Sequence, residues 1–176
     1  LWPQFDNFGM SFLDGTSRAE DYSSGRLNIG AIKIIADGSI QGYTGYLSEP
    51  YHKPFHGDAE YRGYPRVAYP ELAEWIKKYH SAGFQLAVHG NGDASIDDIL
   101  DAFEQAQKAF PKEDPRLVLI HAQMAREDQL VRMRGLGVTP SFFSAHTYYW
   151  GDMHRDVTMG EERANRISPA RTAIEQ

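Results

Sequence analysis

The sequence contains no cysteine, and this absence narrows the chemistry that the chain can carry. Disulfide bonds and thiolate metal sites are excluded, so any metal would be held by histidine, carboxylate or modified side chains. A chain without disulfides is compatible with the cytosol, and we predict a cytoplasmic protein.

Basic clusters and long apolar runs are also missing. The net charge is -6 and no run of Lys or Arg stands out, which argues against nucleic acid as a partner. No window approaches the ~18 uninterrupted apolar residues of a membrane helix, so we expect no membrane partner. The 176 residues, 41% of them hydrophobic and 24% charged, have the composition of a single globular domain.

Apolar runs and amphipathic segments alternate along the chain. Runs rich in apolar residues predict buried strands at 31–36, 84–89, 116–121 and 138–143. Helical spacing of apolar residues predicts helices at 71–82, 95–110 and 127–134. This order is typical of an α/β fold with a parallel sheet covered by helices, either open or closed into a barrel. In both architectures, chemistry gathers at the carboxyl ends of the strands.

Two stretches stand outside this alternation. Residues 1–28 form an irregular lead-in, and residues 40–69 form a long loop rich in Gly, Pro and Tyr. Loops of this length are usually functional lids or disordered, and six tyrosines argue against disorder. We interpret residues 40–69 as a cover packed over the strand ends.

Two histidines end successive predicted strands. His89 closes the run FQLAVH and His121 closes RLVLIH. They are either unrelated, hydrogen-bonded strand ends or a pair of ligands for one ion, since neighbouring strands lie only ~4.8 Å apart. Neutral imidazole is a common ligand for zinc, so the pair on adjacent strands favours a metal site.

A lysine interrupts the first apolar run. Alternation along the strand AIKIIAD places Lys33, Ile35 and Asp37 on one face. A buried lysine is costly unless it is paired. Three alternatives follow: Lys33 forms an ion pair, for which Asp37 is the candidate, it extends its amine to water, or it has a functional amine with a lowered pKa.

Further candidates follow the second and fourth strands. Asp93 in H-G-N-G-D lies where the next helix should begin, and we interpret it as the N-cap. Past residue 143, the segment SAHTYYWGDMHRD carries His146, Trp150 and His154. It is either an aromatic surface loop or the mouth of a pocket, and the sequence leaves both alternatives open.

Four segments, taken in order, resemble the motifs of the amidohydrolase superfamily. They are IKIIADGSIQGYTGYLSEPY, GFQLAVHGNGDASIDDILDAFEQA, RLVLIHAQM and GVTPSFFSAHTYYWGD. The most similar branch is the third amidohydrolase family, typified by N-substituted formamide deformylase. Members carry K-[IVL]-x-x-D-G, H-x-x-G-D and a strand-end I-x-H, and the similarity extends from about Leu27 to the C-terminus.

The resemblance implies a fold and a set of roles. The fold would be part of a metal-dependent (β/α)8 TIM barrel, about strands four to seven, with residues 1–176 as one partial barrel domain. A divalent metal, zinc by preference, would be held by Lys33, His89 and His121, with Lys33 carboxylated to bridge two ions. Water activated by this metal would attack a C–N bond in a small-molecule amide or cyclic amide. His146, Tyr43 and Trp150 would contact the substrate, and Asp37 and Asp93 would brace the site.

The sequence also departs from the family pattern. The first-strand H-x-H pair and the strand-eight aspartate have no counterpart here, and the chain begins with Leu1 instead of methionine. We therefore expect a fragment of the barrel, inactive by itself, whose unpaired strand edges favour association into a homo-oligomer. The alternative is a complete, non-catalytic α/β binding domain in which Lys33, His89 and His121 are structural.

Overall fold

A parallel sheet of four strands in chain order forms the centre of the computed structural model, which describes residues 1–175. The strands are β1 (Ile32–Ile35), β2 (Leu86–Gly90), β3 (Leu117–His121) and β4 (Val138–Phe142). Each pairs in parallel with the next, and all four lie within the predicted runs to one residue. Gln176, the last residue of the predicted domain, lies outside the described residues.

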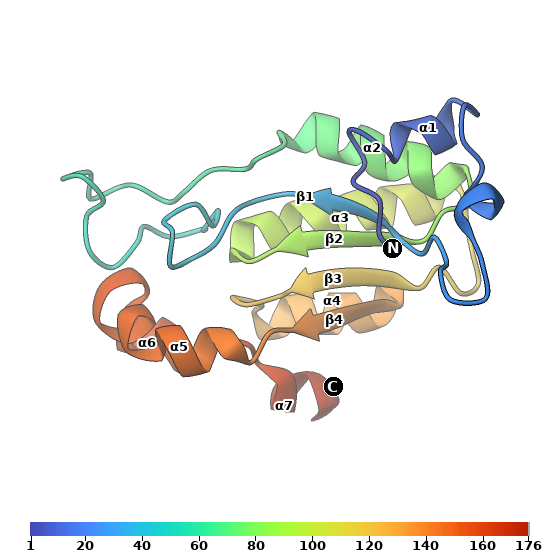
Figure 1. Ribbon diagram of the computed structural model, residues 1–176. Helices are drawn as coiled ribbons and strands as arrows, with labels where there is room; N and C mark the ends of the chain where they lie inside the picture. The colour runs from blue at the N-terminus through green and yellow to red at the C-terminus, as the bar shows by residue number, and fades with distance from the viewer. Residues whose placement is uncertain (176) are drawn as a thin grey trace.

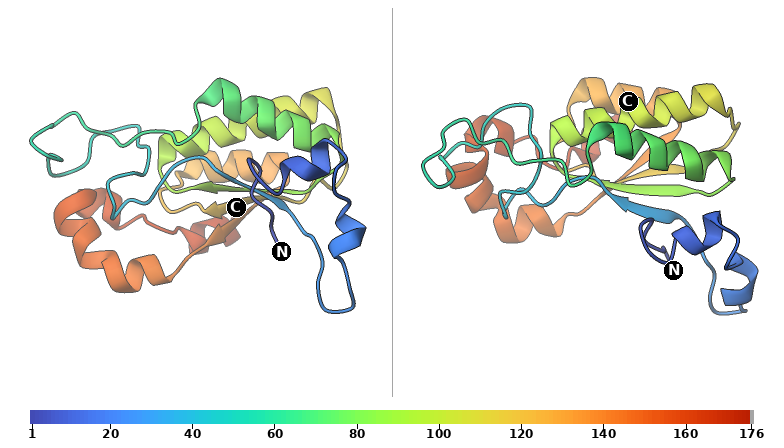
Figure 2. Two further views of the ribbon diagram at one scale, coloured as in Figure 1. Left: turned by 45° about the horizontal axis from the view of Figure 1, so that its top comes forward. Right: turned by 90° about the horizontal axis from the view of Figure 1, so that it is seen from above.

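Three helices connect the strands and lie side by side on one face of the sheet (Figure 2). They are α2 (Tyr69–Ser81), α3 (Asp93–Ala109) and α4 (Glu127–Leu136), as the helical spacing predicted. Apolar side chains on α2 and α3, among them Ile76 and Phe103, are fully buried against the sheet. Helix α4 continues past Gly135 and ends where Gly137 adopts a left-handed conformation (φ 68), which glycine reaches at low cost.

The strand register divides the sheet into two faces. Ile34, Val88 and Leu119 lie in one row, are buried, and belong to the main hydrophobic core beneath the helices. The opposite face carries Lys33 in register with Ala87, and Ile35 in register with His89. The alternation predicted from the sequence therefore holds within β1 and β2.

The chain termini add short elements at the two ends of the sheet. The lead-in contains α1 (Met10–Leu13) and a 3₁₀ turn, η1 (Ala19–Tyr22), and its first residues pair in parallel with β1, with Phe5 N–H donating to the Lys33 carbonyl at 3.0 Å. After β4 come α5 (Ala145–Met153), the π-helix η2 (His154–Thr158), α6 (Gly160–Ala164) and α7 (Ala170–Glu175). The aromatic surface loop considered for the segment after residue 143 is thus replaced by helix. None of the helices within residues 1–175 combines the length and apolarity needed to cross a bilayer.

The long loop 40–69 lies beyond the strand tips, on the side that all four arrows point to (Figure 1). Helices α5 and α6, which follow β4, lie on the same side. The loop and these helices share a second apolar cluster, whose buried members are Ile40, Leu47, Tyr51, Met124 and Met159. Backbone hydrogen bonds from His52 to Thr158 (2.8 Å) and from Lys53 to Val157 (3.0 Å) join the two segments. The loop is therefore an ordered, packed part of the molecule.

Candidate metal-binding site

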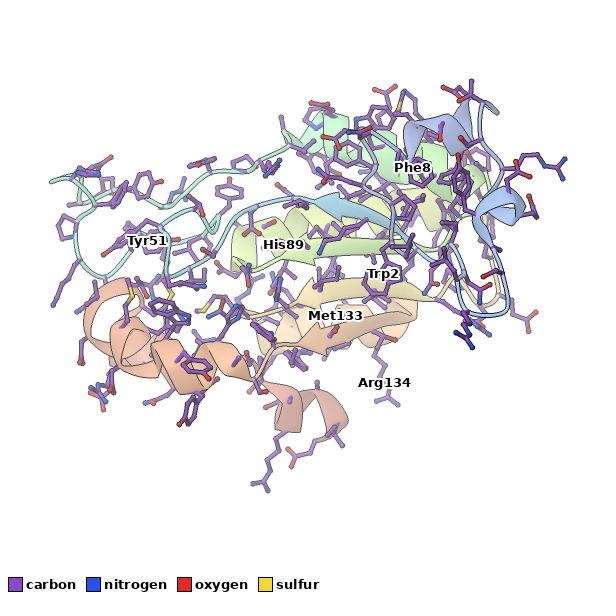
Figure 3. The ribbon with its side chains drawn as sticks, viewed as in Figure 1. Trp2, Phe8, Tyr51, His89, Met133 and Arg134 are labelled. Carbon is purple, nitrogen blue, oxygen red and sulfur yellow. The ribbon has the colours of Figure 1, made fainter. Side chains whose placement is uncertain are left out.

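Three histidine rings gather at the carboxyl ends of the strands. His89 on β2 and His121 on β3 have ring centroids 4.6 Å apart, and His146 on α5 lies 5.3 Å from His121. Figure 3 shows His89 near the tip of its arrow, on the side where Tyr51 of the long loop lies. The structure therefore brings together the two predicted strand-end residues and adds a third imidazole.

His121 reaches this position through an unusual backbone conformation. In the register of the sheet, His121 pairs with Gly90. This row of residues faces the helices, because a Cβ added at Gly90 would lie 2.5 Å from Ile99 of α3. Simple alternation would therefore direct His121 away from His89, which pairs with Ile120. However, His121 and Ala122 both have positive φ angles, 73 and 46, which turn the chain at the strand end. The ring of His121 thereby lies beside the ring of His89.

All three imidazoles are held in the neutral form. Burial lowers the pKa of His89, and the charges of Lys33 and Arg66 act in the same direction. Burial, followed by the neighbouring His89, lowers the pKa of His121 to about 4. Burial also lowers the pKa of His146. Neutral imidazole is the form that coordinates metal, so this electrostatic environment suits a metal site.

The orientation of His89 is fixed by its neighbours. Its Nε2 lies 3.0 Å from the carbonyl of Gly38 and 3.0 Å from the amide nitrogen of Asn91, which itself donates to the same carbonyl at 2.7 Å. The carbonyl only accepts and the amide nitrogen only donates, so the two contacts favour opposite tautomers of the ring, while both hold the ring in place. Asn91 was missed at the level of sequence, although it lies inside the H-G-N-G-D motif.

Asp37 organises the backbone behind the histidines. Its carboxylate is fully buried and accepts backbone N–H groups from Tyr46 (3.0 Å), Asn91 (3.0 Å) and Gly92 (2.8 Å). Burial raises the pKa of Asp37 to about 7, and these three hydrogen bonds oppose that rise. Its Oδ1 also lies 3.5 Å from His89 Nε2. Asp37 therefore ties together the loop after β1 and the loop after β2.

Lys33 lies on the same face as His89, two positions earlier in the register. Within residues 1–175 its amine forms no ion pair, so the predicted pairing with Asp37 is not found. Its charge contributes to the lowered pKa of both His89 and His121, although burial is the larger cause. The amine thus lies within electrostatic range of the two rings.

The other predicted substrate contacts lie elsewhere. Tyr43 stacks on Phe55 with ring centroids 4.6 Å apart, inside an aromatic cluster of the long loop. Trp150 on α5 is 42% exposed. In the described part of the chain neither ring pairs with the three histidines, whereas Phe143 lies 4.8 Å from His146.

Asp93 is not the N-cap of α3, because Gly92 occupies that position. The carboxylate of Asp93 instead accepts the backbone N–H of Ser48 at 2.9 Å and a short hydrogen bond from its hydroxyl, and it pairs with Arg126 at 3.3 Å. A tertiary contact with Ser48 has thus replaced the local cap. The long loop also packs against the cap position, because a Cβ added at Gly92 would lie 1.8 Å from the Tyr46 carbonyl oxygen.

Two ring nitrogens of the histidine group lack a hydrogen-bond partner within the described residues. Nδ1 of His121 and Nδ1 of His146 are both buried without a hydrogen-bond partner, a condition that is costly unless something binds there. These orphaned nitrogens fit a metal. No group of three or more His, Asp or Glu side chains within residues 1–175 is arranged to hold one, so the donor set is incomplete.

Comparison with known proteins decides the family. The sequence profile of the amidohydrolase family matches residues 10–176. The chain belongs to the amidohydrolase family. The predicted family and the predicted fold, α/β and part of an amidohydrolase barrel, are both confirmed.

Named relatives support this assignment over part of their length. This amidohydrolase-family chain is 32% identical to a putative amidohydrolase, YtcJ, of Bacillus subtilis over 120 residues, covering 68% of the chain and 21% of that protein. It is 26% identical to N-substituted formamide deformylase of Arthrobacter pascens over 163 residues, covering 92% of the chain and 29% of that protein.

Solved structures share the fold. An uncharacterized metal-dependent hydrolase from Pyrococcus horikoshii superposes with a TM-score of 0.78 at 26% identity, over 99% of this chain and 33% of that one. A second, from Pyrococcus furiosus, gives a TM-score of 0.76 at 28% identity, over 99% and 34%. The chain thus spans about a third or less of the relatives that it matches.

Proposed function

We propose that this chain forms part of the active site of a metal-dependent hydrolase that cleaves the C–N bond of an amide or cyclic amide. One observation carries the proposal: two neutral imidazoles, His89 and His121, lie 4.6 Å apart at the ends of adjacent parallel strands. Family membership supports hydrolytic chemistry, and the restriction to C–N bonds is our inference from the names of the relatives.

His89 and His121 are the proposed ligands, together with Lys33 as its carbamate. Zinc is the metal we propose, because two imidazoles and an oxygen donor, in the absence of cysteine, match its preferences. The residues fit in two respects, since His89 is held at its Nε2 by Gly38 and Asn91, and the buried Nδ1 of His121 has no hydrogen-bond partner within the described residues. When bound, the metal would lower the pKa of water and polarise a carbonyl group.

The remaining residues position the substrate and exclude water. The His146 ring lies 5.3 Å from the His121 ring, where its imidazole would orient a substrate carbonyl. The ordered loop 40–69, including Tyr43, and helix α5, including Trp150, would wall the pocket and shield it from solvent. Asp37 would brace His89 by fixing the two loops around it, and Asp93 would brace the loop through Ser48.

The substrate that we propose is a small amide with an apolar or aromatic substituent, in agreement with the aromatic loop. A relative named N-substituted formamide deformylase is compatible with this class. We further propose a cytoplasmic protein that associates with itself along its open strand edge and has no nucleic-acid partner. Because the donor set is partial, we expect weak metal affinity and no turnover by the 176-residue chain alone.

Metal affinity tests the proposal. Zinc would be titrated into the metal-free chain, and the dissociation constant measured for wild type, His89→Ala, His121→Ala and His56→Ala. The last is a matched control, since His56 is exposed and lies in the long loop. We expect wild type and His56→Ala to bind zinc equally and the other two to bind it at least about tenfold more weakly. Equal zinc affinity in all four proteins would contradict the proposal and favour a structural role for the histidines.

A further inference from the structure

The turn that carries His121 depends on contacts made outside the sheet. His121 and Ala122 are consecutive non-glycine residues in the left-handed region, with φ angles of 73 and 46. Such residues are strained and persist only where their surroundings hold them. The structural question is therefore which contacts hold this turn in place.

Backbone hydrogen bonds secure the two ends of the turn. Ala122 N–H donates to the Gly90 carbonyl at 3.1 Å, and Met124 N–H donates to the Asn91 carbonyl at 2.9 Å. Both acceptors belong to the end of β2, so the turn is attached to the neighbouring strand. Gln123, between the two donors, is fully buried, and its carbonyl accepts Ser168 N–H at 2.7 Å.

The side chain of Gln123 meets a second buried histidine. Its amide Nε2 lies 3.0 Å from Nε2 of His154, which is fully buried in the π-helix η2. An amide nitrogen only donates, so His154 Nε2 accepts and its Nδ1 carries the proton. Nδ1 then donates to the hydroxyl of Thr158 at 3.0 Å, which fixes the ring within the π-helix.

From these contacts we infer that Gln123 and His154 are positioning residues, which hold the left-handed turn so that the His121 ring faces His89. The π-helix supports this role, because such bulges frequently occur at functional sites. Within η2, His154 and Thr158, four residues apart, meet side chain to side chain. This inference rests on the proposed metal role of His121, although the ring geometry can be tested without metal.

The test is ring-to-ring contact in the metal-free chain. With histidine labelled by isotopes, nuclear Overhauser contacts between the His89 and His121 rings would be measured in wild type and Gln123→Met. Gln129→Met is the matched control, because Gln129 is also a fully buried glutamine but hydrogen-bonds to Asp93 and Asp97 of α3. We expect the contact in wild type and Gln129→Met, and its loss in Gln123→Met. An undiminished contact in Gln123→Met would overturn the inference.

A second pair of variants guards against a general loss of folding. His154→Gln keeps a group able to accept the Gln123 hydrogen bond, whereas His154→Leu has none. We expect the ring contact to be retained in His154→Gln and lost in His154→Leu, with folding of both checked by circular dichroism. Equal ring contact in these two variants would also overturn the inference.

Zinc titration of the same proteins connects the geometry to binding. Loss of a residue that orients a ligand typically costs about tenfold to a hundredfold in metal affinity. We expect this loss in Gln123→Met and His154→Leu, and a change of less than about twofold in Gln129→Met, which leaves the turn intact. If no variant and not even wild type binds zinc, the proposed function fails, while the metal-free ring contacts still decide the role of Gln123 and His154.

Discussion

The sheet with its three helices and the region beyond the strand tips are held together in different ways. In the first, the core joins β1–β4 to α2, α3 and α4 through buried aliphatic and aromatic side chains. In the second, which we call the strand-end region and define as residues 36–69, 91–93, 121–126 and 143–168, buried polar contacts accompany a smaller apolar cluster. Asp37, Asp93 and His154 each hydrogen-bond to a segment far away in sequence.

This difference explains where strain and unsatisfied groups occur. The sheet core satisfies its backbone through the strand ladders and the helices, whereas the strand-end region contains left-handed residues and buried nitrogens without partners, as at His121. Such features cost stability and are retained mainly at functional sites. The comparison predicts that mutations in the first region affect global stability and those in the second affect the site.

The largest effect is expected in the sheet core. Phe103 of α3 is fully buried, so Phe103→Ala should lower the free energy of unfolding by about 3–5 kcal/mol through lost burial and a residual cavity. Urea denaturation measures this loss. Phe110→Ala, in a residue at the end of the same helix that is 42% exposed, should change it by less than about 1 kcal/mol. Equal effects of the two changes would remove the distinction between core and surface.

Acid should weaken the strand-end region next. Burial lowers the pKa of His154 to about 4. The unfolded chain binds this proton near pH 6.5 while the folded chain resists it, so the contribution of His154 to stability is full above pH 6.5 and is lost as the pH drops towards 4. For His154 the loss reaches at most about 3 kcal/mol.

Unfolding curves between pH 7 and pH 4 measure this dependence. His154→Gln removes the titrating group, and its stability should depend less steeply on pH than that of wild type. A variant with the same slope as wild type would show that His154 does not resist protonation.

Asp37→Asn should have an intermediate effect that stays local. The carboxylate accepts three backbone N–H groups, and an amide would turn its NH₂ group towards at least one of them. We expect a loss of about 2 kcal/mol and faster hydrogen exchange at the amides of Tyr46, Asn91 and Gly92. Asp14→Asn, in an exposed residue, is the control. Unchanged exchange at these three amides would show that Asp37 does not join the loops.

The smallest effect is expected from Ser48→Ala. The Ser48 hydroxyl donates to Asp93, and its loss should cost about 1 kcal/mol, mostly as local opening of the long loop. Hydrogen exchange at the Leu47 and Tyr51 amides should then rise about fivefold, with little change in global unfolding. Ser81→Ala, at the end of α2, should leave exchange in the loop unchanged. A fall in global stability without faster loop exchange would place Ser48 in the main core instead.

The sequence predicted the first region far better than the second. Strand and helix periodicity is a local property, so the bounds of β1–β4 and of α2–α4 differ from prediction by two residues at most. The meeting of His89 and His121 was also predictable, because parallel strands end at the same edge. The way it is achieved was not, since alternation alone turns His121 towards the helices.

Tertiary contacts account for the remaining differences. Asp93 has the sequence context of a helix cap, yet Ser48, 45 positions away, recruits its carboxylate. Asn91 and Gln123 carry no distinctive local signal, because their partners, Gly38 and His154, become neighbours only through the fold. His146 and His154 are eight residues apart, which is about two helical turns. This spacing could have predicted that the two histidines lie on one face of a helix.

The central claim is that His89 and His121 bind metal before any other histidine of this chain. The most direct measurement is nuclear magnetic resonance of histidine ring nitrogens while Zn²⁺ is added to the metal-free chain. We predict that the signals of His89 and His121 change first, at the lowest zinc concentration. If those of the exposed His52 and His56 change while the strand-end signals stay constant, the account is contradicted.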